Sequence, residues 1–292
     1  MEYILENEYL RLTVTEWGAQ VKSVIRKCDG VEHIWNADPA VWGYHAPVLF
    51  PYAGKVKDNR IHVRGQVLEN APQHGFARIK NHRLLEQTAD HITLVLSEDE
   101  DTRKLFPYRF RLLSDFRLEG DRLLHKLTVE NTDTEPFSFG IGFHPAFTVP
   151  FDDNHTLADY ELRFSHMESP LCLEAPTGLM NGRYYSLGNN IRSIPLEAGM
   201  FDKDSHCMVS LRSHSLGLYE KDTGRAVVCT IDNFPYCLIW SKPGTPRFIC
   251  IEPWHSLPSH EEDSCQWEQK AAAAILAPGE HWSTTLETAF LR

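Results

Sequence analysis

Apolar and polar residues alternate in short segments along most of the chain, and this pattern predicts β-strands. Leu10-Arg11-Leu12-Thr13-Val14 and His91–Ser97 both show the period of two expected of a strand with one buried face. Two predicted strands enclose Glu119-Gly120-Asp121 and two others enclose Lys221–Gly224, which indicates two hairpins. The hairpin strands are predicted at residues 108–118, 122–130, 216–220 and 225–231. Further strands are predicted at residues 3–5, 20–27, 208–211, 236–241, 247–251 and 282–291.

Helical periodicity is nearly absent. A run of alanines favours a helical turn within residues 269–277, before Pro278-Gly279 stops it. Residues 150–200 are rich in Pro, Gly and Asn, and we expect long loops or irregular strands there. The chain shows no linker, low-complexity tract or fixed-period repeat. These features predict one all-β domain over residues 1–292, a large sandwich or layered antiparallel sheets.

Composition places the chain among ordinary soluble globular proteins. Hydrophobic residues make up 42% and charged residues 24% of its 292 residues. The net charge of −11 argues against a nucleic-acid or anionic membrane partner. No run approaches the roughly 18 apolar residues of a membrane helix, and the first residues lack the pattern of a signal peptide. We therefore expect a cytoplasmic protein.

The seven cysteines do not form a metal-binding or disulfide pattern in the sequence. Their number is odd, no pair has C-x-x-C spacing, and several stand inside apolar runs. The 15 histidines likewise show no H-E-x-x-H or comparable ligand spacing. We expect the cysteines to be small buried hydrophobic residues in a reducing compartment.

Glu252 is the first candidate for chemistry. The apolar run Phe248–Ile251 predicts a buried strand, and Pro253 is expected to end its hydrogen-bond ladder. A carboxylate that leaves a core beside Trp254 is partly desolvated, so its pKa should rise toward the range of a general base or acid. The same position also fits a strand-end carboxylate in a structural ion pair.

Two histidines occupy comparable positions. His144 precedes Pro145 at the end of a strand thinned by glycines, where the backbone is held extended and a ligand can approach. His74 and Arg78 flank a glycine and a phenylalanine. Taken singly, His144 fits a hydrogen-bonded structural histidine and His74 fits a turn residue. Together with many aromatic residues, these groups suit a sugar, which needs apolar stacking and many hydrogen bonds.

Four motifs in register carry a family resemblance that spans essentially the whole chain. They are His74-Gly75-Phe76-Ala77-Arg78, Gly142-Phe143-His144-Pro145-Ala146-Phe147, Phe201-Asp202 and Cys250-Ile251-Glu252-Pro253-Trp254. In order and spacing this set resembles the aldose 1-epimerase (galactose mutarotase) superfamily, and in particular its LacX-like branch. The resemblance implies the galactose mutarotase-like β-supersandwich and an isomerase that interconverts the α and β anomers of an aldose.

The resemblance also implies roles for individual residues. Glu252 is expected to be the general base that takes the proton of the anomeric hydroxyl, and His144 the general acid that protonates the ring oxygen. His74, Asp202 and Arg78 are expected to bind the sugar. No metal or organic cofactor is needed, because proton transfer alone carries the reaction. The expected partner is a small aldose, and the protein is expected to be a monomer or homodimer.

A basic loop departs from the family pattern. Gly54-Lys55-Val56-Lys57-Asp58-Asn59-Arg60-Ile61 has a lysine and a longer spacing where family members carry arginine, so either Lys55 or Arg60 is expected to face the sugar. With Arg78, these residues would suit a phosphate clamp, which makes hexose-6-phosphate mutarotase an alternative. A non-catalytic carbohydrate-binding protein is the other alternative, since fold alone does not fix function.

Overall fold

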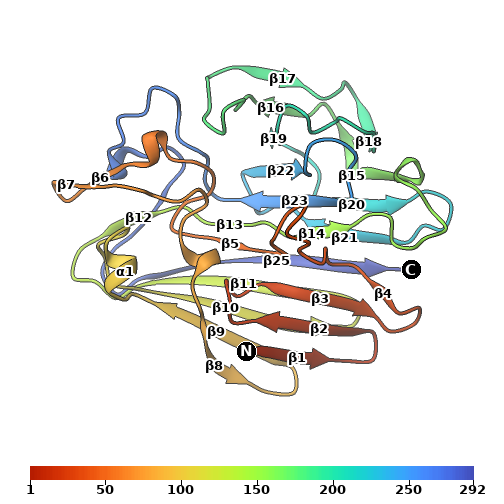
Figure 1. Ribbon diagram of the computed structural model, residues 1–292, viewed down its shortest axis with the longest axis horizontal. Helices are drawn as coiled ribbons and strands as arrows, with labels where there is room; N and C mark the ends of the chain where they lie inside the picture. Colours follow the sequence, from red (N-terminus) through yellow and green to blue (C-terminus); the bar gives the residue numbers. More distant parts are fainter.

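The computed structural model describes residues 1–292 and consists almost entirely of antiparallel strands (Figure 1). The largest sheet has nine strands and runs from β18 at the upper right of Figure 1 to β8 at the bottom. In spatial order these strands are β18 (Ile191–Pro195), β15 (Tyr160–Glu168), β20 (Ser215–Glu220), β21 (Ala226–Thr230), β25 (His281–Leu291), β11 (Arg122–Asn131), β10 (Phe110–Glu119), β9 (His91–Ser97) and β8 (Arg83–Gln87).

The second large sheet has eight strands and holds β23 near its middle. Its order is β17 (Tyr184–Ser186), β16 (Leu171–Leu173), β19 (His206–Val209), β22 (Tyr236–Trp240), β23 (Phe248–Trp254), β13 (Gly142–Phe143) and β5 (Val48–Leu49), and β14 (Ala146–Thr148) also pairs with β23. Thus β23 is paired along both of its edges, and all seven of its residues are buried.

Smaller elements complete the fold. A four-stranded sheet comprises β1 (Glu2–Glu6), β2 (Leu10–Thr15), β3 (Val21–Arg26) and β4 (Val31–Glu32), and two-stranded sheets pair β6 (Ile61–Val63) with β7 (Gln66–Leu68) and β12 (Phe137–Phe139) with β24 (Ala274–Leu276). The helical segments are α1 (Glu100–Arg103), η1 (Lys57–Asn59), η2 (Ala77–Ile79), η3 (Leu157–Asp159) and η4 (Trp267–Gln269). None of these helices is long or apolar enough to cross a membrane.

One apolar core of 59 buried residues joins the sheets. Leu10, Leu12 and Val14 are buried while the residues between them are more exposed, so the alternation in the sequence places one face of β2 in the core. Both predicted hairpins are present, and Gly120 takes the positive φ of +59° that its turn requires. The all-β layered architecture predicted from the sequence is confirmed.

Three local expectations were wrong. The alanine-rich segment 269–277 contains the end of η4 and strand β24, because pairing of Ala274–Leu276 with β12 outweighs the helical propensity of alanine. The expectation of loops or irregular strands over residues 150–200 was wrong only for β15, which runs for nine residues. Pro253 does not end its strand, because β23 continues to Trp254 along β22. The opposite ladder is interrupted between β13 and β14, and a residue without an N–H donor is tolerated at such a place.

Candidate active site

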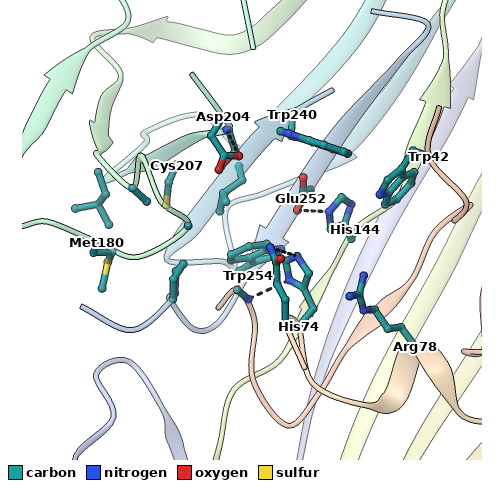
Figure 2. A pocket seen from close by; sticks show the side chains of 18 of the residues that line it. Trp42, His74, Arg78, His144, Met180, Asp204, Cys207, Trp240, Glu252 and Trp254 are labelled. Carbon is teal, nitrogen blue, oxygen red and sulfur yellow. Dashed lines mark hydrogen bonds and ion pairs between the residues drawn. The ribbon is translucent and has the colours of Figure 1, made fainter. Parts of the chain in front are cut away.

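A cavity of about 330 Å³ opens over the face of the eight-stranded sheet that carries Glu252 (Figure 2). Register explains which side chains face it: Leu238 and Trp240 of β22 lie opposite Glu252 and Cys250 of β23, so they point to the same side. The cavity is lined by Trp42, Gly54, Gln73, His74, Arg78, His144, Leu173, Ala175, Gly178, Met180, Asp204, Ser205, Cys207, Leu238, Trp240, Lys242, Glu252, Trp254 and Pro258.

His144 and Glu252 are in direct contact at the base of the cavity. The distance between His144 Nε2 and Glu252 Oε2 is 3.2 Å, and the exposed fractions of the two side chains are 7% and 2%. Glu252 is held by β23, whereas His144 stands in the break between β13 and β14, beside the strand that carries its partner. The contact therefore joins two residues that are 108 positions apart in the chain.

Burial sets the protonation of this pair. It raises the pKa of Glu252 well above its usual value, and the nearby carboxylate of Asp204 raises it further. Burial lowers the pKa of His144 to about 3, with a smaller contribution from the charge of Arg78. Both effects disfavour the charged forms, so burial favours the neutral pair, in which the proton that the two groups share lies on Glu252.

Aromatic rings enclose the imidazole of His144. Trp42 stacks on it with ring centres 5.0 Å apart and planes inclined by 24°, and Trp240 meets it edge-on at 5.8 Å. The indole N–H of Trp254 donates to the carbonyl of Phe143 at 3.2 Å, which ties β23 to the segment that leads into His144. Figure 2 shows Trp42, Trp240 and Trp254 around the pair, an arrangement that suits the apolar faces of a sugar ring.

His74 is fixed as a neutral hydrogen-bond donor. The backbone N–H of Gly54 donates to His74 Nδ1 at 3.0 Å, so the ring proton of the neutral imidazole is on Nε2. Burial lowers the pKa of His74 well below its usual value, with His144 and Arg78 acting in the same direction. Gly75 lies so close to the chain that an added Cβ would be 2.1 Å from the carbonyl oxygen of Phe50. Only glycine permits this turn.

Arg78 enters the cavity from the short helix η2. Its guanidinium lies 4.7 Å from the centre of the Tyr44 ring, and its buried Nε has no hydrogen-bond partner. Burial lowers the pKa of Arg78, but an arginine remains charged at neutral pH. The charge therefore acts on the neighbouring histidines and leaves N–H donors available for a ligand.

Comparison with known proteins agrees with this geometry. The family described as aldose 1-epimerase matches residues 1–288. The chain belongs to the aldose 1-epimerase family. Two forms of the LacX protein of Lactococcus lactis, plasmid and chromosomal, are 30% identical to it and are aligned over 94% of both chains.

Solved structures show the same fold. A galactose mutarotase related enzyme from Lactobacillus acidophilus superposes with a TM-score of 0.95 at 26% identity, covering 100% of this chain and 98% of that one. A galactose mutarotase-like protein from Lactobacillus casei superposes with a TM-score of 0.90 at 26% identity, covering 99% of both chains. The galactose mutarotase-like supersandwich predicted from the sequence is confirmed.

In this aldose 1-epimerase family member, four of the seven site residues predicted from the sequence line the cavity, namely His74, Arg78, His144 and Glu252. The other three lie elsewhere. Asp202 is exposed and accepts a hydrogen bond from the backbone of Gly244 at 2.9 Å. Arg60 is exposed and pairs with Glu69 at 2.9 Å. Lys55 is half-buried, and its Nζ donates to the carbonyl of Thr177 at 3.4 Å.

Several lining residues were not anticipated. Asp204, two residues after the predicted Asp202, lines the cavity at its exposed side. Trp240 was detectable as a residue on the same face as Leu238 within its predicted strand. Trp42 and Lys242 belong to irregular segments, and no periodic pattern in the sequence indicates their direction.

Proposed function

We propose that the protein is a mutarotase that interconverts the α and β anomers of a hexose, with Glu252 as general base and His144 as general acid. The observation that carries the proposal is the 3.2 Å contact between His144 Nε2 and Glu252 Oε2 on the wall of the cavity. The anomeric hydroxyl oxygen and the ring oxygen are bonded to the same carbon. An acid and a base that each reach one of these oxygens must therefore lie near each other, as His144 and Glu252 do.

The single proton of the pair suits such a reaction. The raised pKa of Glu252 and the lowered pKa of His144 favour the proton on the carboxyl group. Direct contact lets the proton pass to His144, which leaves a carboxylate to accept the anomeric proton while the imidazolium protonates the ring oxygen. The opened aldehyde rotates about C1–C2 and closes with the roles reversed, so each turnover restores the pair.

The surrounding groups support a neutral hexose as substrate. His74 and Arg78 present N–H donors, Asp204 presents acceptors, and the tryptophans present apolar faces. The phosphate clamp that the sequence allowed is not assembled, because Arg60 pairs with Glu69 at the surface and Lys55 is bonded to a carbonyl. We therefore expect turnover of glucose or galactose to exceed turnover of glucose 6-phosphate.

Polarimetry on Glu252→Gln tests the assignment. The amide keeps the shape of the side chain but cannot accept the proton, so the rate should fall about 10²- to 10⁴-fold. Quenching of tryptophan fluorescence by the sugar should persist, since three tryptophans line the cavity. Glu69→Gln, which changes an exposed carboxylate that does not line the cavity, is the control. Wild-type turnover in Glu252→Gln would disprove the role, and sugar binding without turnover in the parent would favour a binding protein.

A further inference from the structure

A third potential ligand atom lies beside the catalytic pair. The donor atoms of His144, Cys250 and Glu252 are all within 4.8 Å of one another, and all three residues are buried. Cys250 and Glu252 are two positions apart on β23 and face the same side. Ala146 pairs with Cys250, which places the segment carrying His144 along the same edge. No ligand spacing was visible in the sequence because the set combines two distant segments.

The distances suit a tetrahedral metal ion. Bonds of about 2 Å from zinc to imidazole nitrogen and carboxylate oxygen place these two atoms roughly 3.3 Å apart. The observed distance between His144 Nε2 and Glu252 Oε2 is 3.2 Å. A thiolate bond is somewhat longer, at about 2.3 Å, and Cys250 Sγ lies within 4.8 Å of both of the other ligand atoms. His144 and Glu252 line the cavity, which gives an ion a route of entry and leaves a fourth position for water.

The charges also suit a divalent cation. A thiolate, a carboxylate and a neutral imidazole together carry two negative charges, which a divalent ion neutralises within this buried site. A second cluster of the same ligand types, Asp152, His155 and Glu220, differs in a decisive way. The guanidinium of Arg225 donates to both carboxylates of that cluster, so the position of a cation is already taken.

We propose that His144, Cys250 and Glu252 bind a thiophilic divalent cation such as Zn²⁺, which inhibits the protein by occupying its acid and base. Coordination uses the Nε2 lone pair and the carboxylate oxygen that proton transfer requires. The inhibitory consequence rests on the proposed mutarotase function, whereas metal binding itself does not. The cation is an inhibitor in this proposal and takes no part in the reaction.

Cadmium titration tests binding without reference to activity. All seven cysteines are free thiols, so Cys28 and Cys265, the two that are not buried, are first replaced by serine. In that background, Cd²⁺ should produce one equivalent of the ultraviolet thiolate-to-cadmium band. Cys250→Ala should abolish the band, while Cys207→Ala should retain it. Cys207 is the matched control because it is a buried thiol that lines the same cavity outside the cluster.

Inhibition of mutarotation by Zn²⁺ tests the consequence. Cys250→Ser, which nearly preserves the size of the side chain, should need at least about 10-fold more Zn²⁺ than the parent for half-inhibition of its own turnover. Equal Cd²⁺ binding by the Cys250 variants and the parent would overturn the proposal, as would loss of the band in Cys207→Ala. If the parent binds Cd²⁺ through Cys250 but does not turn over any aldose, the metal site stands and the mutarotase function fails. Circular dichroism confirms that each variant is folded.

Discussion

Two clusters in this protein combine histidine with carboxylates, yet their electrostatics are opposite. In the first, His144 and Glu252 are buried and have no cation within hydrogen-bonding distance. In the second, Asp152, His155 and Glu220 surround Arg225, which donates to Glu220 at 2.6 and 2.8 Å. Tyr160 and Thr223 also donate to Glu220. Every carboxylate of the second cluster that faces Arg225 is thus charged and paired.

The pKa shifts of the corresponding groups in the two clusters have opposite directions. Hydrogen bonding to Asp152 raises the pKa of His155, while burial lowers the pKa of His144 to about 3. Arg225 lowers the pKa of Asp152, while burial raises that of Glu252. A cluster of fixed charges holds the loop after β14 against β20 and β21. A buried pair with one proton and no fixed counter-ion keeps that proton available for transfer.

The largest expected effect is on the mutarotation rate, which should depend on His144 but not on His155. His144→Gln should lower kcat/KM for mutarotation about 10²- to 10⁴-fold, because glutamine cannot transfer a proton at neutral pH. His155→Gln should leave kcat/KM within twofold of the parent. Polarimetric rates at pH 7 on the same aldose check both variants. Comparable losses in the two variants would show that the distinction drawn between the clusters is wrong.

The free energy of unfolding should depend more on the second cluster than on the first. Arg225→Met leaves the buried Glu220 without its charged donor, and we expect a loss of about 2 to 3 kcal/mol in the free energy of unfolding. Its turnover at 25 °C should be that of the parent, because Arg225 lies outside the cavity. Urea denaturation measures the loss, and Arg292→Met provides a surface control. An unchanged midpoint would mean that the network does not hold the fold together.

Sequence reasoning identified the residues of the first cluster better than their geometry. Glu252, His144 and His74 follow from motifs at strand ends and in a tight turn, where the local chain restricts the backbone. Their convergence depends on the pairing of β23 with β13 and β14, which is non-local. The inward direction of Asp204 rather than Asp202 depends on a turn in which Asp204 takes a φ of +93°. No alternation in the sequence encodes that turn.

The fold was predictable for a different reason. Strands β2, β10 and β11 are half-buried, so their alternation is visible in the sequence. In β9 the alternation in the sequence did not predict the burial, because all residues from Ile92 to Leu96 are buried. The segment that forms β24 was misread because a short strand gains its stability from its partner β12 rather than from its own residues. The second cluster was not predicted from the sequence either, because the loop after β14 and the turn after β20 meet only in the folded protein.

The pH dependence of stability should distinguish the histidines again. The unfolded chain takes up a proton at His144 below about pH 6.5, while the folded protein does so only near pH 3, so acidification in this window favours unfolding. His144→Gln should make the free energy of unfolding fall less steeply, by up to about 1.4 kcal/mol per pH unit. The raised pKa of His155 has the opposite sign. His155→Gln should lose stability at pH 5 and none at pH 9. Urea titrations across this range measure both.

The smallest effect concerns two aspartates that lie two positions apart. Asp204 lines the cavity, so Asp204→Asn should raise KM for the sugar several-fold by weakening a charged hydrogen-bond acceptor, with a smaller change in kcat. Asp202 bonds the backbone of Gly244 outside the cavity, and Asp202→Asn should leave KM unchanged. Initial rates over a range of sugar concentrations decide between them. If KM rises only in Asp202→Asn, the sugar-hydroxyl acceptor is Asp202, as the sequence motif predicted, and not Asp204.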